Sequence, residues 1–546
     1  METPRGKLTE LRIGNFKAFG EVQHIPIRPL TLIFGPNSSG KSTIIHSLAL
    51  LHEAERTGSF RVGHPAISGL SIDLGGFEQY VHGRKLENTV LLGATFTVKD
   101  EESLGAPYLF YFDLTIGQKV RSSNGRLEAN AGIRTCKIGN RNGSLVTVGY
   151  GAPWLLHPNV SYQNAIRNGL KTKYENLRLY QSEDKTKLSA VKKELHNARA
   201  ANARFRAEME RELSDLAGRL QRTSARERIH WEPHTRWSKL VPAGVRMKRG
   251  NKHTLLSEPI CSYLDQVAAI LNQSFIESIE SLRYLGPLRA YPPRHLPIPE
   301  EDPNWEAAGG YAWDTISRDE KLRQAVNTWL SKDYLKTKYE IRILRYLSSD
   351  RIEKLLQDDF KNHESQLTKG LRNPKQRDKF LKQLVDSINR EGAFEIRLFD
   401  RNTKTLVSHR DVGVGISQLL PVLVAAYGSE GKIIAVEQPE LHLHPALQAE
   451  LGDLFIEAAK VGRRNTVIIE THSEHLLLRV MRRIRETTTH RNPSASLTLK
   501  PTDVAVLYVD PLDGGGVIRE IPLNEQGELV KPWPGGFFEE GLREMF

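Results

Sequence analysis

Residues 31–45 read TLIFGPNSSGKSTII and contain, from Gly35 to Ser42, the pattern G-x-x-x-x-G-K-[ST] at every fixed position. An apolar run precedes the pattern and an apolar helical run follows it, as in the strand–loop–helix context of a phosphate-binding loop. Glycines let backbone N–H groups turn onto phosphate oxygens, and the helix that starts there points its positive dipole end at the same anion. The stretch therefore predicts a nucleotide-binding loop rather than a Gly/Ser-rich surface loop.

This loop also predicts how ATP and Mg²⁺ would be held. Lys41 is expected to reach the β- and γ-phosphates, and the Ser42 hydroxyl is expected to ligate Mg²⁺. The residues expected to bind the nucleotide here are Gly35, Asn37, Ser38, Ser39, Gly40, Lys41, Ser42 and Thr43.

The composition is that of a soluble globular protein. The chain has 546 residues, of which 39% are hydrophobic and 26% charged, so two or three domains are expected. No apolar run approaches the ~20 residues of a membrane span, and the N-terminus lacks the apolar core of a signal peptide. Two cysteines, Cys136 and Cys261, fit a reducing cytoplasm and are expected to be buried free thiols.

The positive charge is concentrated in one segment. The whole chain carries a net charge of +12, and residues 161–252 hold 22 Lys/Arg against 10 Asp/Glu, which is the entire excess. A localised basic segment is typical of a phosphate-binding surface, so DNA or another nucleic acid is an expected partner. A basic but merely solvated helix surface is the alternative.

Hydrophobic patterns outline the elements of the fold. Strands are expected over residues 8–34 and, as an antiparallel set with a hairpin at Asn142-Gly143, over residues 61–150. Residues 188–220 have the heptad-like spacing of a long helix, which needs a partner along its seam. The remaining patterns predict helices over 260–283 and 316–390, a strand–turn–strand pair over 393–410 and a hairpin over 501–524.

Two later strand ends carry the groups that a phosphate loop requires. The buried-strand run 432–436 ends in Glu437, whose carboxylate is expected beside Ser42 in the Mg²⁺ shell. A second run, 466–469, ends in Glu470-Thr471-His472. Because parallel strands end at one edge of a sheet, Glu437 and His472 are expected to meet there. We interpret His472 as functional, although a lone histidine is more often structural.

A second glycine-rich helix start lies upstream of these strands. Residues 411–418 read DVGVGISQ and precede an apolar helix. Gly415 and Ser417 are therefore expected to form a second anion site. Since the chain already has its own phosphate loop, this site is available to another nucleotide.

Together these motifs resemble the ABC-type ATPase heads of the SMC, RecF and OLD class. The motifs that carry the resemblance are GPNSSGKS (35–42), DVGVGISQ (411–418), VEQPELHLHP (436–445) and ETHSEH (470–475). A narrower resemblance, to bacterial OLD-like ATP-binding proteins associated with defence and lacking a Toprim domain, rests on LGPLRAYP (285–292) and the WPGGFF tail (533–538).

The resemblance implies an α/β fold in which the ATPase head is split by a helical or coiled-coil insertion. The expected parts are an N-terminal ATPase lobe over 1–160, a basic helical arm over 161–255, a helical connector over 256–392 and a C-terminal ATPase lobe over 393–546. It also implies a homodimer in which two heads meet head to tail around two ATP molecules. Ser417 of one head would contact the γ-phosphate held by the other, and His472 would sense that phosphate.

Two site assignments depart from the family pattern or are weaker. Gln438 stands where ABC heads have a catalytic glutamate, and an amide can orient water but cannot accept its proton. Slow hydrolysis is therefore expected, with Glu437, Gln438 and His472 as the catalytic group. Glu440 could replace the base only if its loop bends inward. The alternative is hydrolysis at an ordinary rate, with the substrate phosphate accepting the proton. Gln79 is the candidate for the additional metal-contacting glutamine.

Two functions stay open at this point. The first is a cytoplasmic, dimeric ATP-driven switch that engages DNA or a partner nuclease, as such ATPases do in anti-phage defence. The alternative is an ATP-binding scaffold with little turnover that holds a protein effector. Zinc ligation by His442, His444, His472 and His475 is disfavoured because no cysteine accompanies them. Intrinsic nuclease chemistry is disfavoured because no acidic strand-end cluster follows His472.

Overall fold

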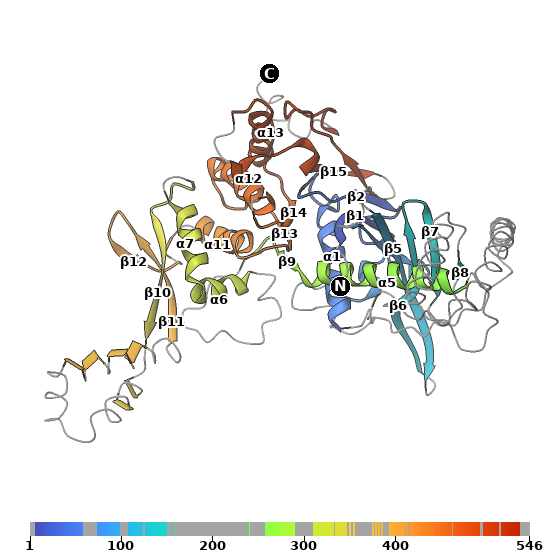
Figure 1. Ribbon diagram of the computed structural model, residues 1–546, viewed down its shortest axis with the longest axis horizontal. Helices are drawn as coiled ribbons and strands as arrows, with labels where there is room; N and C mark the ends of the chain where they lie inside the picture. The colour runs from blue at the N-terminus through green and yellow to red at the C-terminus, as the bar shows by residue number, and fades with distance from the viewer. Residues whose placement is uncertain are drawn as a thin grey trace, which may run out of the picture.

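The computed structural model has three β-sheets with helices packed between and around them (Figure 1). This mixed α/β architecture is the predicted fold class. The structure describes residues 6–57, 74–98, 108–123, 126–149, 155–156, 240, 257–289, 309–331, 334–346, 349–350, 353–354, 374–375, 377–378, 381–382, 384–385, 393–409, 411–412, 414–460, 462–491, 495–512 and 515–534.

A six-stranded sheet forms the centre of the molecule. Its order is β16-β15-β3-β14-β13-β9, and every neighbouring pair is parallel except β15 with β16. The strands are β3 (Leu30–Phe34), β9 (Leu282–Leu285), β13 (Ile433–Glu437), β14 (Thr466–Glu470), β15 (Val504–Leu512) and β16 (Gly515–Glu520). Because β3 comes from the beginning of the chain and its two neighbours come from the end, both ends are needed to build this sheet.

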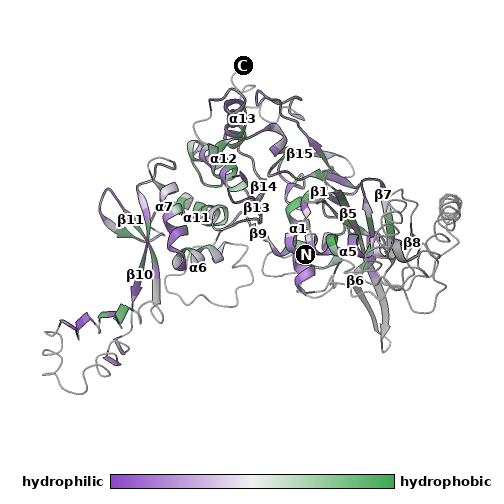
Figure 2. Ribbon diagram, viewed as in Figure 1, coloured by the Kyte–Doolittle hydropathy of each residue, from purple (hydrophilic) through white to green (hydrophobic). Residues whose placement is uncertain are grey.

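Helices cover both faces of the central sheet, so its strands are apolar almost throughout. Ile33, Ala435 and Ile468 face a core shared with helix α1 (Lys41–Thr57). Leu32 and Val436 face a second core. That core includes α11 (Val414–Tyr427), α12 (Pro445–Lys460) and α13 (Glu474–Thr488). Green, hydrophobic residues predominate on α11 (Figure 2).

A seven-stranded antiparallel sheet lies on the α1 side. Helix α5 (Ser257–Glu280) crosses this sheet, and its Phe275 ring meets Phe112 edge-on with centroids 5.0 Å apart (Figure 1). The predicted hairpin is confirmed, since one strand ends at Asn140 and the next begins at Gly143 with φ 112°. In sheet order the strands are β2 (Gln23–Pro26), β1 (Gly6–Gly14), β4 (Val90–Val98), β5 (Tyr108–Ser123), β6 (Arg126–Asn140), β7 (Gly143–Gly149) and β8 (Leu155–Leu156).

A three-stranded sheet packs with α6 (Gly310–Arg318) and α7 (Glu320–Leu330) beside α11. Its strands are β10 (Tyr339–Tyr346), β11 (Ala393–Asp400) and β12 (Thr405–Val407). The predicted strand–turn–strand pair at 393–410 is confirmed, but the helical prediction for 316–390 is wrong at β10. Apolar and polar residues alternate only over residues 339–343 of this strand, and its pairing with the distant β11 makes it a strand.

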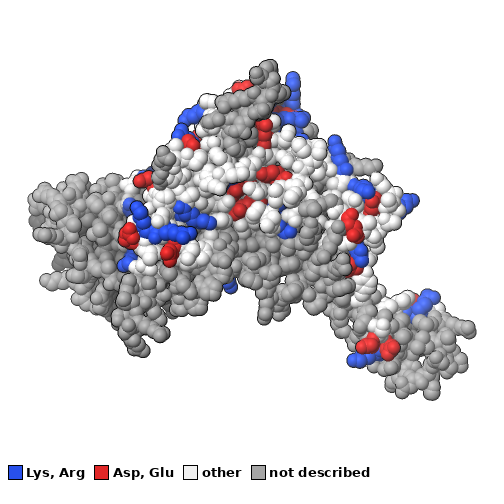
Figure 3. All heavy atoms as spheres, turned by 180° about the vertical axis from the view of Figure 1, so that it is seen from behind, with Lys and Arg blue, Asp and Glu red and all other residues white. Residues whose placement is uncertain are grey.

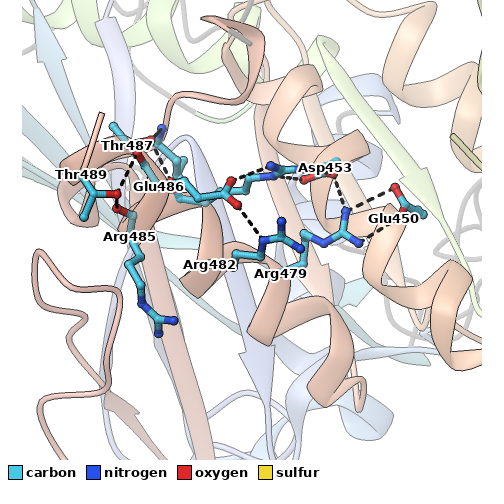
Figure 4. Close-up of polar contacts among 10 residues, drawn as sticks. Glu450, Asp453, Arg479, Arg482, Arg485, Glu486, Thr487 and Thr489 are labelled. Carbon is cyan, nitrogen blue, oxygen red and sulfur yellow. Dashed lines mark hydrogen bonds and ion pairs between the residues drawn. The ribbon is translucent and has the colours of Figure 1, made fainter. Parts of the chain in front are cut away.

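Helices α12 and α13 are joined by a buried group of ion pairs (Figure 4). Asp453 accepts from Arg479 Nη1 at 2.5 Å and from Arg483 Nη2 at 2.6 Å. Arg483 Nη1 also pairs with Glu486 at 2.6 Å, and Arg479 Nη2 with Glu450 at 3.0 Å. This group fixes the helix pair that follows both acidic strand ends.

The C-terminal region returns to the phosphate loop. The predicted hairpin at 501–524 is confirmed as β15–β16. After it, the Trp533 ring packs edge-on against Phe34, the last residue of β3, and against Tyr508, with centroid distances of 5.3 and 5.8 Å. The aromatic tail therefore docks, at least at Trp533, on the head itself.

Other expectations divide between described and undescribed residues. Cys136 is a buried free thiol. Within the described ranges, no helix is long and apolar enough to cross a membrane. The long helix predicted at 188–220 lies outside the described residues, as does nearly all of the 161–255 arm, so the division of the chain into four parts stays a prediction.

The short helices are α2 (Phe77–Tyr80) and the 3-10 turns His82–Arg84, Ala495–Leu497 and Pro501–Asp503.

Candidate nucleotide site

The phosphate loop connects β3 to α1, as the motif predicts. Gly35 and Gly40 have φ angles of 147° and 102°, which L side chains rarely adopt. A Cβ at Gly35 would lie 2.5 Å from the Val509 carbonyl oxygen, and one at Gly40 would lie 2.3 Å from Ala18 Cβ. The two glycines are therefore required by backbone angle and by space.

The two acidic strand ends lie side by side. Glu437 and Glu470 are paired residues at the ends of the parallel strands β13 and β14, and β14 also pairs with β3, which leads into the loop. Both carboxylates are buried, with residue exposures of 5% and 4%. The predicted meeting of the loop with the acidic strand ends is thus found in the structure.

Ser42 lies close enough to Glu470, the carboxylate that was not assigned to the metal from the sequence, to influence the pKa of that carboxyl. Burial, reinforced by the negative charges of Glu437 and Glu440, raises the pKa of Glu470 to about 7, while Ser42 and Lys41 act in the opposite direction. Glu470 Oε2 is buried and accepts no hydrogen bond in the described part of the chain. A buried carboxylate oxygen of this kind is chemically suited to bind a cation.

Replacing Glu470 with glutamine is expected to stabilise the nucleotide-free protein at pH 8 and to change its stability little at pH 5. Because the pKa of Glu470 is higher in the folded state, the folded protein binds one more proton than the unfolded protein between about pH 4.5 and pH 7. The free energy of unfolding of the native protein therefore falls as the pH rises through this window. The relief at pH 8 is on the order of 3 kcal/mol. Urea unfolding at both pH values measures it, and an equal effect at both would contradict the assignment.

Glu437 is held by side chains that the motif search missed. Glu437 Oε1 accepts from the Tyr284 hydroxyl at 3.0 Å and lies 3.2 Å from His46 Nε2. His46 Nδ1 in turn lies 2.7 Å from Lys17 Nζ. The available signal for His46 was its position one helical turn after Ser42. Lys17 and Tyr284 are brought in by the turn before β2 and by strand β9, so no local pattern marked them.

Lys41 and His472 lie close enough to interact electrostatically. Lys41 Nζ donates to the Pro36 carbonyl at 2.8 Å, and burial lowers its pKa although Glu470 and Glu440 oppose the change. Burial, together with the Lys41 charge, lowers the pKa of His472. A neutral His472 near the loop lysine is suited to donate or accept a hydrogen bond at a phosphate oxygen.

Glu440 joins the loops that follow β13 and β14. Its carboxylate accepts from Thr471 Oγ1 at 2.8 Å and from His472 N at 2.7 Å, so it ties the two strand-end loops together. Gln438 is half-buried in a left-handed conformation with φ 44°, and its backbone N–H donates to the Glu470 carbonyl at 2.8 Å. The residue after Glu437 is therefore held in a conformation that its neighbours must stabilise.

The glycine-rich start of α11 contacts the loop after β13. A Cβ at Gly415 would lie 2.7 Å from the His442 carbonyl oxygen. Ser417 is buried, and its hydroxyl donates to the His409 carbonyl at 3.0 Å. Ser417 must exchange this hydrogen bond to reach a nucleotide on another head, so its role stays a prediction.

Gln79 lies on the short helix α2 and is exposed. Its side-chain oxygen accepts from Gly76 N at 2.7 Å. Its assignment as a metal contact also stays a prediction. Arg289, in the loop after β9, does contact Glu437. Its Nη2 donates to the Glu437 carbonyl at 2.7 Å.

The residues at this edge fit Mg²⁺–ATP. Mg²⁺ commonly takes one or two carboxylates, a hydroxyl and phosphate oxygens. Ser42 with Glu470 or Glu437 would hold the ion, Lys41 and the loop amides would hold the phosphates, and the ion would neutralise charge on the transferred phosphoryl group. Among the described residues, no cluster of three His, Cys, Asp or Glu side chains suited to a purely protein-bound metal is found.

Comparison with protein families gives three matches. Residues 10–230 match a model described as "AAA domain", and residues 287–479 match one described as "AAA domain, putative AbiEii toxin, Type IV TA system". Two long stretches of the chain are therefore similar to AAA domains. The two matched ranges contain the phosphate loop and both acidic strand ends. Residues 499–546 match "Protein of unknown function (DUF3696)".

Solved structures similar to this head include SMC proteins. One is the Smc head domain with an extended coiled coil, bound to the C-terminal domain of ScpA, from Pyrococcus furiosus, with 11% identity, TM-score 0.33 and coverage of 99% of this chain and 98% of that chain. Another is the SMC head domain from Thermotoga maritima, with 10% identity, TM-score 0.31 and coverage of 95% and 100%. No curated protein matches the chain.

Proposed function

We propose that this ATPase head works as a homodimeric, slowly hydrolysing ATP switch that engages DNA or a partner nuclease. The observation that carries the ATPase part is the convergence of Lys41, Ser42, Glu437 and Glu470 at one sheet edge, with His472 beside them. Each head would close over ATP held by the other, with Ser417 contacting the γ-phosphate in trans. ATP binding then joins two heads, and hydrolysis separates them.

Gln438 sets the pace of this switch. Glutamine at the catalytic position can orient the attacking water but leaves its proton to the substrate phosphate. Both Glu440 oxygens accept hydrogen bonds from the Thr471–His472 segment, and we expect these bonds to keep the carboxylate away from the attacking water. We therefore expect the ATP-bound dimer to be long-lived and ATP turnover to be slow.

Replacing Gln438 with glutamate is expected to raise kcat for ATP at least about tenfold, since a positioned base typically contributes 10²–10⁴-fold. Steady-state phosphate release from the full chain measures it, with Gln438→Ala as the matched control that lacks both functions. A native rate that is already fast, and unchanged in Gln438→Glu, would overturn the slow-switch proposal while leaving the ATPase assignment intact.

The basic segment 161–252 is the proposed nucleic-acid contact. On the face in Figure 3, the described residues carry Lys/Arg and Asp/Glu side chains in mixture. Over the sequence, residues outside 161–252 carry equal numbers of basic and acidic side chains. Binding through this segment would make affinity fall steeply with salt, because each phosphate contact releases counterions.

Charge reversal at Arg199, Arg204 and Arg206 is expected to weaken binding of double-stranded DNA at least about tenfold at 50 mM salt and to flatten its salt dependence. Reversal at three exposed arginines outside the segment, Arg318, Arg482 and Arg519, is the control and is expected to have little effect. Fluorescence anisotropy with and without ATP measures both. Equal losses in the two triple variants would refute a localised site.

A scaffold function without nucleic acid is the second candidate. It is favoured by the family match whose printed description names a toxin system, since such a head would control a protein effector. Absence of DNA and RNA binding by the full chain at low salt, with ATP-dependent dimerisation retained, would select it. Anti-phage defence is the proposed setting for either function.

A further inference from the structure

Arg289 is a buried arginine in the loop directly after β9. Its residue exposure is 4%, whereas its neighbour Leu288 is 76% exposed. The guanidinium donates one hydrogen bond, from Nη2 to the Glu437 carbonyl oxygen. In the described part of the chain, Nε and Nη1 are buried and make no hydrogen bond. Burial lowers the pKa of Arg289 to about 10, although Glu440 and Glu437 favour the charged form.

This position fixes one peptide group from two sides. Arg289 holds the carbonyl of Glu437, and the Glu470 carbonyl holds the N–H of Gln438, which belongs to the same peptide. That peptide leads into the left-handed Gln438, at φ 44°. A left-handed non-glycine residue persists only where its surroundings determine it, so these two hydrogen bonds fix the backbone from which the Gln438 side chain projects.

Arg289 is itself held by the glycine-rich start of α11. Gln418 Oε1 accepts from Arg289 N at 3.1 Å, and Gln418 Nε2 donates to the Arg289 carbonyl at 2.9 Å. Gln418 follows Ser417 directly, and both side chains are buried. Helix α11 is thus connected to the Glu437–Gln438 peptide through two sets of hydrogen bonds, from Gln418 to the Arg289 backbone and from the Arg289 side chain to the Glu437 carbonyl.

We propose that Arg289 is a positioning residue that couples α11, through Gln418, to the Glu437–Gln438 peptide. Contact of a second head with Ser417 would shift Gln418 and Arg289 together and so align Gln438 for hydrolysis. This inference rests on the proposed ATPase switch. A purely structural residue at this place would cost less as an apolar side chain, because it is expensive to bury a guanidinium of which two donors make no hydrogen bond to the described residues.

The kinetic test compares Arg289→Lys, Gln418→Leu and the double variant in the full chain. Lysine keeps the positive charge beside the carboxylates but lacks the planar fork. Each single variant is expected to lower kcat for ATP about tenfold or more, with KM changed less than about threefold, and the double variant is expected to lose no more than the worse single one. Arg283→Lys, at an exposed arginine on the preceding strand β9, is the control. Unchanged kcat in both single variants, or multiplying losses in the double, would overturn the coupling.

A second readout is independent of turnover. Hydrogen exchange at the Gln438 amide in the nucleotide-free chain reports the hydrogen bond to Glu470. Arg289→Lys is expected to speed this exchange about tenfold, with the amides of β15 unchanged. Unchanged exchange at Gln438 would refute the positioning role even if kcat falls. Absence of turnover in the native chain, with faster exchange in Arg289→Lys, would refute the proposed ATPase switch and leave the positioning role standing.

Discussion

Replacing Lys41 with alanine is expected to abolish measurable ATP hydrolysis and to weaken ATP binding about a hundredfold. The Lys41 residue is 4% exposed, and its Nζ donates to the Pro36 carbonyl of the phosphate loop. In this buried place it is the cation set against Glu470 and Glu440. Losing one partner of a buried, charged hydrogen bond costs about 2–5 kcal/mol, which corresponds to the stated loss in affinity.

Titration calorimetry with Mg²⁺–ATP measures the binding loss, and phosphate release measures the turnover. Lys321→Ala, an exposed lysine on α7, is the matched control and should leave both unchanged. Because Lys41 also opposes the raised pKa of Glu470, the variant should bind Mg²⁺–ATP still less well at pH 6 than at pH 8. Native-like affinity in Lys41→Ala would place the nucleotide elsewhere.

Replacing Asp453 with alanine is expected to cost about 3–5 kcal/mol of folding free energy. Asp453 is 4% exposed and accepts from both Arg479 and Arg483, whose pKa values it helps to raise (Figure 4). Its removal leaves two guanidinium groups between α12 and α13 without their shared anion. Loss of the paired charge on one partner is far more costly than loss of an exposed pair.

Urea unfolding of the nucleotide-free chain measures this cost. Arg482→Ala is the control, because its pair with Glu486 involves an arginine side chain that is 60% exposed, and such pairs contribute less than about 1 kcal/mol. A loss below about 1 kcal/mol in Asp453→Ala would mean that the group of ion pairs contributes little to stability. Loss of ATP binding without loss of stability would instead connect Asp453 to the nucleotide site.

Local motifs predicted the parts of the site whose chemistry is written in neighbouring residues. The phosphate loop, the acidic end of β13 and the histidine after β14 each combine a strand, a turn and a helix within a short stretch. Their meeting followed from one physical rule, that parallel strands share a carboxyl edge. The same rule places Glu470 at this edge, but its position in the sequence does not show which of the two strand-end carboxylates lies beside Ser42.

The remaining contacts depend on distant pairing that no local pattern records. Tyr284 reaches Glu437 because β9 is the neighbour of β13, and Arg289 follows from the same pairing. An arginine in a proline-rich loop gives no sign that it is buried. Strand β10 was missed for the same reason, since its partner β11 lies about fifty residues further along the chain.

The central claim is that each ATP site is built from two chains, and complementation tests it most directly. Lys41→Ala and Ser417→Arg are purified separately, each checked for native-like melting and Ser417→Arg also for ATP binding, and then mixed in equal amounts. A random mixture contains half heterodimers, each with one site that has an intact Lys41 and an intact Ser417. If each ATP site is built from two chains, ATP turnover is nearly absent in either variant alone and returns to about a quarter of the native rate in the mixture. A mixture no more active than its components, although ATP still joins the two chains, would contradict the account.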